Sequence, residues 1–355
     1  MRKLPELVLL AIFMLIISAP LFSSLPAPTL IWKQNDPSSS NASMANILKA
    51  AVEFPEAYNQ YFNDHYLLHQ QQVDAFHYCR YHFLHETIFP NVVIGKQDWL
   101  YYTGERNLND YECTSPFTSQ ELQTIRQRLL DWDEDLQERG IQFYVVFAPN
   151  KETIYPQHLP DQIKPGLNAC RIDQVMKTLE GTSLTVLDLR TAMERASQKA
   201  QVYHRTDTHW NDTGAVYATR EIFTLIQQKF PQVSIPSFDE YYLEKKPFSG
   251  DLAGFLPRDD RFVEQETILV PAFQSLVEYK EGENQAILSA IPVSELPSAI
   301  IFRDSFCDAL IPFLSEHFSK VNYVSSFTVD YDLLEKEKPD IVIFEIAQRY
   351  LTVLR

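Results

Sequence analysis

The sequence predicts an α/β fold built on an open parallel sheet flanked by helices. With 355 residues, of which 45% are hydrophobic, the chain is able to bury a large core. It contains continuous apolar runs, which are typical of strands buried on both faces of a parallel sheet. Helical patterns separate these runs, as expected when crossovers join parallel strands. The five runs are residues 141–149, 183–189, 299–306, 321–326 and 339–347.

The N-terminal segment, residues 1–25, predicts a membrane helix that acts as a signal-anchor. Its apolar run, residues 7–25, follows the basic residues Arg2 and Lys3, and such a pattern favours export with the basic end inside. The run just reaches the roughly 20 residues that span a bilayer. A cleaved signal peptide and a buried helix stay open as alternatives.

The rest of the chain divides by composition into three segments. Residues 26–43 are rich in Pro, Ser and Asn, which predicts a linker. Residues 44–89 contain many aromatic residues and leucines and few helix breakers, which predicts an N-terminal helical extension. Residues 90–355 form the predicted α/β domain, which starts with two short strands within 91–104.

Helix signals fall between the apolar runs. A helix is predicted over 118–139, with Thr118 and Glu121 as a capping pair and Gly140 as its stop. Two further helices are predicted at about 168–180 and over 306–318. Another is predicted to begin after Asn211 or Asp212 as its cap, and a last one in the stretch DYDLLEKEK before the final apolar run.

Charge and cysteine content narrow the possible partners. The formal net charge of −16 repels phosphate backbones, so no nucleic-acid partner is expected. The four cysteines, Cys79, Cys113, Cys170 and Cys307, include no CxxC pair of a zinc ribbon or thioredoxin-type site. One disulfide, between Cys113 and Cys170, and four free thiols are both compatible with the sequence.

Chemically capable side chains follow the predicted strands. In open α/β sheets, ligands bind beyond the carboxyl ends of the strands, so these side chains are expected at one edge. The stretch HRTDTHWND (204–212) follows the second strand, and Asp304-Ser305 ends the third. The remaining strand ends bring Asn150, Lys151, Glu345, Gln348 and Arg349.

Three of these residues have the chemistry of a nucleophilic triad. Ser305 needs a base to take its proton, and His209 is suited to that role. Asp207 precedes the histidine by two residues, so on an extended segment both side chains point the same way and the carboxylate orients the imidazole. The helix after Ser305 would offer free N–H groups to an oxyanion.

Other readings of these residues remain open. Ser305 could be a simple N-cap, and Cys307 could be the nucleophile in its place. Asp207 and His209 could bind a metal with His204 as third ligand. Neither a metal nor a bound cofactor is expected. The candidates for substrate or oxyanion contacts are Arg303, Asp304, Phe306, Gln348, Arg349, Lys151 and Trp210.

Several motifs resemble the alginate O-acetyltransferase family (AlgJ/AlgX type), which is SGNH-hydrolase-like. They occur in family order over about residues 50–355 and comprise FPEAYNQYFNDHYLLHQQQ (54–72), VIGKQDWLYY (93–102), APNKETIYPQHLP (148–160), TDTHWN (206–211), SGDLAGFLP (249–257), DSF (304–306) and KPDIVIFEIAQRYL (338–351). The resemblance implies a circularly permuted SGNH-like catalytic domain over 90–355, in which Asp207-x-His209 precedes the nucleophile Ser305. The chain departs from the family at Arg303, where glycine is usual, and Gln348 or Arg349 stands in for the usual asparagine.

The function implied by this resemblance is acetyl transfer to hydroxyl groups of an extracytoplasmic polysaccharide. It implies a membrane-bound O-acyltransferase as the supplier of acetyl groups. It also implies an enzyme anchored in the inner (cytoplasmic) membrane, with its catalytic domain in the periplasm. A carbohydrate acetylesterase with the same triad and a non-catalytic polysaccharide-binding or assembly protein are the alternatives.

Overall fold

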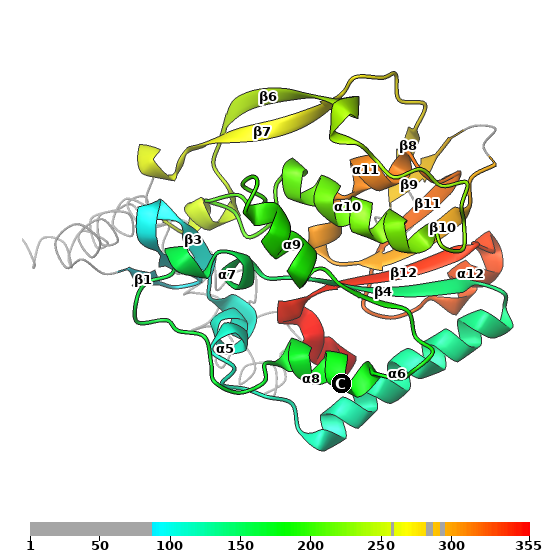
Figure 1. Ribbon diagram of the computed structural model, residues 1–355, viewed down its shortest axis with the longest axis horizontal. Helices are drawn as coiled ribbons and strands as arrows, with labels where there is room; N and C mark the ends of the chain where they lie inside the picture. The colour runs from blue at the N-terminus through cyan, green and yellow to red at the C-terminus, as the bar shows by residue number, and fades with distance from the viewer. Residues whose placement is uncertain (1–86, 257–258, 282–286, 292–294) are drawn as a thin grey trace, which may run out of the picture. The chain divides into compact units, whose positions relative to one another are not determined.

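The computed structural model describes residues 87–355, apart from 257–258, 282–286 and 292–294 (Figure 1). The predicted membrane helix 1–25, the linker 26–43 and residues 44–86 of the predicted extension lie outside the described residues. Within the described part, no helix combines the length and the apolar character needed to cross a membrane.

The main sheet contains the five predicted strands in parallel. In the described residues it has seven strands, in the order β5-β4-β12-β10-β11-β9-β8. The expected parallel strands are confirmed as β4 (Gln142–Ala148), β5 (Val186–Asp188), β10 (Ser298–Arg303), β11 (Lys320–Ser325) and β12 (Ile341–Ala347).

The prediction of a purely parallel sheet is wrong at one edge. There β9 (Ile287–Ala290) and β8 (Glu278–Glu281) add antiparallel strands, so the sheet is mixed. Both strands have only four residues, and β8 is exposed along its whole length. Without a buried face, such an edge strand carries no apolar pattern by which a sequence could reveal it.

Helices cover both faces of the sheet and form a three-layer sandwich (Figure 1). Alternate strand residues face two separate cores: Tyr144 and Ile301 belong to one, and Phe143 and Phe302 to the other. The first core includes residues of α9 (Arg190–Ser197), α10 (Asp212–Ile226) and α11 (Ile311–Ser315). The second includes residues of α6 (Ser119–Glu138), α8 (Arg171–Leu179) and α12 (Tyr331–Glu337).

Local capping signals define where the helices begin and end. Thr118 and Glu121 form the predicted capping box of α6, and Gly140 follows this helix with a φ of 74°. Asn211 caps α10 by accepting a hydrogen bond from the N–H of Gly214 at 3.0 Å. The start of α10 is therefore anchored directly behind the Asp-x-His stretch.

Smaller elements surround the carboxyl edge of the sheet. The two strands expected within 91–104 are β2 (Val92–Ile94) and β3 (Leu100–Tyr102), and β1 (Ile88–Phe89) adds a third antiparallel strand. The short helices α5 (Asn107–Tyr111) and α7 (Lys151–Ile154) follow. An antiparallel ribbon, β6 (Tyr241–Phe248) with β7 (Glu264–Pro271), packs beside α10.

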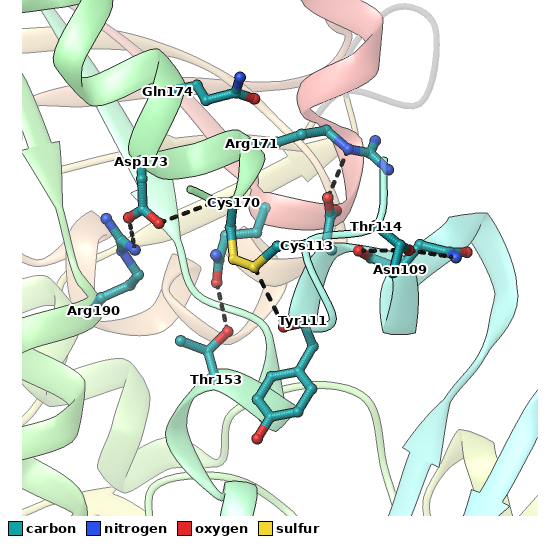
Figure 2. The surroundings of a disulfide bond; sticks show 12 residues. Asn109, Tyr111, Cys113, Thr114, Thr153, Cys170, Arg171, Asp173, Gln174 and Arg190 are labelled. Carbon is teal, nitrogen blue, oxygen red and sulfur yellow. Dashed lines mark hydrogen bonds and ion pairs between the residues drawn. A yellow bond between two sulfur atoms is a disulfide. The ribbon is translucent and has the colours of Figure 1, made fainter. Parts of the chain in front are cut away.

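A disulfide joins Cys113, just after α5, to Cys170, the N-cap residue of α8 (Figure 2). Of the two alternatives that the sequence left open, the structure has the disulfide and not four free thiols. Next to it, Arg171 and Asp110 form a buried ion pair, with 2.7 Å between Nε and Oδ1. Cys307 is a buried free thiol, and Cys79 lies outside the described residues.

Candidate active site

The segment between α9 and α10 folds back on itself and presents the Asp-x-His stretch. Tyr203 and Trp210 form an isolated antiparallel bridge, and the N–H of His204 donates to the carbonyl of His209 at 3.2 Å. The bridge closes a loop that has Asp207 near its tip. A closed loop of this kind holds both members of the pair in one orientation.

Asp207, His209 and Ser305 form one hydrogen-bonded chain. Oδ1 of Asp207 lies 2.7 Å from Nδ1 of His209, and Nε2 of His209 lies 2.9 Å from Oγ of Ser305. These distances lie within the range expected between an acid, an imidazole base and a nucleophile. The structure therefore brings together three residues that the sequence places up to 98 positions apart (305 − 207).

The carboxylate of Asp207 is well supplied with donors. Its Oδ1 also accepts the N–H of His209 at 3.0 Å, and its Oδ2 accepts the N–H of Asp251 at 2.9 Å. Burial alone would raise the pKa of Asp207, but the hydrogen bonds from His209 and Asp251 outweigh it and lower this pKa. The carboxylate is therefore ionised and able to stabilise an imidazolium.

Residues 249–251 approach this carboxylate very closely. A Cβ at Gly250 would lie 2.4 Å from the Cβ of Asp207, so only glycine fits there. The next residue, Asp251, accepts hydrogen bonds from the N–H of Thr208 at 2.8 Å and from its hydroxyl at 2.6 Å. Sequence reasoning did not assign Asp251 to the site, although the stretch SGDLAGFLP was one of the motifs noted.

Ser305 lies at the turn that follows β10. The predicted helix 306–318 is wrong in its continuity: a 3-10 helix, Ser305–Ala309, comes first and α11 follows. Pro312 lacks an N–H, and its ring would clash with the carbonyl four residues earlier, so one α-helix is unable to run through this segment.

Asp304 stabilises the turn with both carboxylate oxygens. Oδ1 accepts the N–H of Phe306 at 2.8 Å, and Oδ2 accepts the N–H of Ala347 at 2.7 Å. The N–H of Phe306, one of the expected oxyanion donors, is thus engaged within the chain. The N–H of Ser305 makes no hydrogen bond to any other described residue.

Lys151 holds the backbone of the Asp-x-His loop. Its buried Nζ donates to three carbonyl oxygens, those of His204 at 3.2 Å, Arg205 at 3.3 Å and Asp207 at 2.6 Å. Three acceptors match the three N–H bonds of an ammonium. Burial lowers the pKa of Lys151 to about 8, which leaves the group protonated at pH 7.

Trp210 and Phe306 join the loop to the serine turn. The indole Nε1 of Trp210 donates to the carbonyl of Phe306 at 2.9 Å, and the two rings lie edge to face at 5.2 Å. The ring of Phe306 also lies 5.0 Å from the imidazole of His209. Both aromatic residues therefore help to fix the distance between His209 and Ser305.

The three remaining candidates differ in how they contact the site. Arg303 contacts Asp308 at 2.5 Å and donates to the carbonyl of Asp304 at 3.2 Å, so it stabilises the turn from behind. Gln348 accepts the N–H of Asn150 at 2.8 Å. The guanidinium of Arg349 lies 5.0 Å from the Phe306 ring centroid.

A cavity of about 10 Å³ lies beside Thr208, Phe306 and Arg349. Its wall includes the buried carboxyl of Glu152, whose Oε2 accepts an N–H from Asn107 at 3.1 Å. Oε1 of Glu152 has no hydrogen-bond partner among the described residues. Burial raises the pKa of Glu152 to about 7.

The alternative readings of the site fare differently. Burial raises the pKa of the Cys307 thiol well above its usual value, which disfavours a thiolate nucleophile. Among the described residues, the side chains near enough to share a metal ion are Asp207, His209 and Asp251, rather than the set with His204. Nε2 of His204 instead lies 3.5 Å from Glu266.

Comparison with known proteins places this architecture in a family. Residues 92–288 match the family model described as the SGNH hydrolase-like domain of the acetyltransferase AlgX. A probable alginate O-acetylase AlgJ from Pseudomonas syringae pv. tomato is 31% identical over 175 residues, covering 49% of this chain and 43% of the relative. Another, from Azotobacter vinelandii, is 24% identical over 286 residues, covering 74% of this chain and 70% of the relative. The first alignment thus spans less than half the length of that relative.

A solved structure supports the same fold. Bacillus cereus PatB1 superposes with a TM-score of 0.57 at 16% sequence identity, covering 73% of this chain and 96% of that chain. At this level of identity the likeness concerns the fold alone.

Proposed function

The chain belongs to the AlgX family of SGNH hydrolase-like acetyltransferase domains, and we propose that it transfers acetyl groups to hydroxyl groups of a polysaccharide through Ser305, His209 and Asp207. The observation that carries this proposal is the hydrogen-bonded chain from Asp207 through His209 to Ser305. The names of the AlgJ relatives add a polysaccharide acceptor.

The proposed first half-reaction acylates the enzyme. Oγ of Ser305 attacks the acetyl carbonyl of the donor while Nε2 of His209 takes the hydroxyl proton, and Asp207 stabilises the imidazolium. The N–H of Ser305 is the backbone donor that remains for the oxyanion. Collapse of the tetrahedral intermediate breaks the bond to the donor, and the imidazolium returns the proton to the leaving group.

The second half-reaction transfers the acetyl group. His209 now takes the proton of a sugar hydroxyl, whose oxygen attacks the acetyl-serine, and Ser305 regains its proton as the new ester leaves. An acetylesterase would follow the same steps with water as the acceptor. The two functions therefore differ only in which nucleophile reaches the acyl-enzyme.

Export and anchoring form a further part of the proposal. The apolar run 7–25 after Arg2 and Lys3 supports an anchor in the inner membrane, and the disulfide between Cys113 and Cys170 supports an oxidising compartment such as the periplasm. A membrane-bound O-acyltransferase would then supply the acetyl group. N-terminal sequencing of the membrane fraction tests the anchor, and a start near residue 26 would contradict it.

The decisive experiment replaces Ser305 with alanine in the full chain. Ser305→Ala should lower acetyl transfer and hydrolysis of small acetyl esters at least about a thousandfold. Intact-mass measurement should find one acetyl group on the wild type after incubation with donor, and none on the variant. Cys307→Ala is the matched control and should still be acetylated.

Three outcomes would contradict the proposal. Near-normal turnover of Ser305→Ala would show that Ser305 is not the nucleophile. Loss of activity with a chelator, restored by zinc, would favour a metal site at Asp207, His209 and Asp251. Hydrolysis of acetyl esters without transfer to any offered oligosaccharide would favour the esterase.

A further inference from the structure

A second cavity, separate from the triad, lies between α10 and the β6–β7 ribbon. Its volume is about 360 Å³, within the range of about 300–1,000 Å³ typical of small-ligand sites. The ribbon is held to α10 by the carboxylate of Asp212, which accepts the N–H of Leu269 at 2.9 Å. The cavity therefore has two fixed walls.

The lining combines aromatic rings with polar side chains. Tyr217 and Phe238 lie with ring centroids 4.8 Å apart, and both are half-buried. Gln265 contributes an amide and Glu266 a carboxylate, whereas the amide of Asn211 is engaged by Gly214 and Gln201. An apolar ring face beside hydrogen-bonding groups suits a sugar ring, which has an apolar face and a rim of hydroxyl groups.

The cavity shares a wall with the triad loop. His204 and Asn211, which line it, flank the loop that carries Asp207 and His209. The N–H of His204 also donates to the carbonyl of His209 at 3.2 Å, so this lining residue is bonded directly to the proposed base.

The charge of the cavity is negative. Both carboxylate oxygens of Glu264 accept hydrogen bonds from the loop backbone, from the N–H of Thr206 at 2.8 Å and the N–H of Arg205 at 2.9 Å. The carboxylate of Glu266 makes no hydrogen bond to another described side chain; it lies 3.5 Å from Nε2 of His204 and 3.9 Å from Nζ of Lys246. Burial lowers the pKa of His204, which favours its neutral form, and raises the pKa of Glu266. The described residues that line the cavity include two acidic side chains and no lysine or arginine.

From this geometry we infer that the cavity is an acceptor subsite for a sugar ring that bears hydroxyl or amino groups and no carboxylate. The inference rests on the proposed acetyl transfer and adds the substrate class. Glu266 would accept hydrogen bonds from sugar hydroxyl or ammonium groups. A uronate carboxylate would instead be repelled by Glu264 and Glu266, because the cavity is partly desolvated.

The test compares oligosaccharides of equal length with the full wild-type chain. Glucosamine and glucose oligomers are set against mannuronate oligomers, with 4-nitrophenyl acetate as the donor. Both kcat/KM for transfer and Kd by calorimetry are measured. We expect the carboxylate-free oligomers to be preferred at least about tenfold. Glu266→Lys should shift this preference toward mannuronate at least about tenfold, and the isosteric Glu266→Gln by less.

Glu244→Lys is the matched control, because it makes the same charge change on the other strand of the ribbon, β6. Glu244 is exposed and does not line the cavity. It should leave the preference unchanged. Equal or better binding of mannuronate by the wild type, or equal effects of the two lysine variants, overturns the inference. An absent acetyl-Ser305 would instead contradict the proposed function, while the Kd values still decide the subsite.

Discussion

Asp207 and Glu152 both lie near the carboxyl edge of the sheet, but Asp207 is partly exposed whereas Glu152 is fully buried, and their chemistry differs. Asp207 accepts hydrogen bonds from His209 and Asp251, and its pKa is lowered. Glu152 accepts one from Asn107, its other oxygen has no partner among the described residues, and its pKa is raised to about 7. Hydrogen bonds therefore outweigh burial at the partly exposed Asp207, whereas burial outweighs them at the fully buried Glu152.

This contrast separates the carboxylate of the proposed triad from a carboxyl that has no role in the proposed reaction. An ionised Asp207 is able to hold an imidazolium, whereas Glu152, half-protonated near pH 7, fills a polar corner beside it. The following predictions test the contrast, starting with the largest expected effect.

Asp207→Asn should lower kcat for acetyl transfer by about 10⁴, since an amide stabilises the wrong tautomer of His209 and carries no charge for the imidazolium. Glu152→Gln is the matched control, because it makes the same acid-to-amide change in a buried neighbour. It should retain activity within a few-fold. The measurement is the steady-state kcat of both variants. Similar decreases in kcat for the two would contradict a special role of Asp207.

Lys151→Met should lower kcat about ten- to a hundredfold with little change in KM. The three loop carbonyls would lose their shared donor, and a small displacement of Asp207 and His209 is costly for catalysis. Lys96→Met, at an exposed lysine paired with Asp161, is the control. A rise in KM for anionic acceptors at unchanged kcat would instead assign Lys151 to substrate binding.

Glu152→Gln should change how stability depends on pH. The carboxyl of Glu152 has an ordinary pKa of 4.5 and a folded-state pKa of about 7, so between these values the folded state binds more protons than the unfolded state. The free energy of unfolding should fall as pH rises through this window, by up to roughly 3 kcal/mol from this group.

The glutamine variant should lack this component. The free energy of unfolding of the variant minus that of the wild type should therefore increase as pH rises from 4.5 to 7.5, as measured by denaturant unfolding of the full chain. Asp110, whose pKa burial raises to about 6, contributes with the same sign in both proteins, and its electrostatic effect on Glu152 is lost in the variant. Parallel pH profiles for wild type and variant would show that Glu152 is already ionised when buried.

The sequence by itself determined the elements that have strong local signals. Five apolar runs identified the parallel strands, because strands buried on both faces lack polar residues. The helix caps were also predictable from the sequence, because a cap depends only on residues within one helical turn; they are the pair Thr118 and Glu121 and the single residue Asn211. The rule of strand ends also indicated Asp207, His209 and Ser305 as one site.

Only the tertiary structure decided which partners complete that site. Asp251 and Lys151 contact the loop from segments 44 and 56 residues from Asp207, and no local pattern encodes such distances. The four-residue strands β8 and β9 carried no periodic signal, and Pro312 interrupted a helix that hydrophobic spacing alone predicted. Strands and caps follow from neighbouring residues, whereas the charge on Asp207 depends on donors that folding brings to it from elsewhere in the chain.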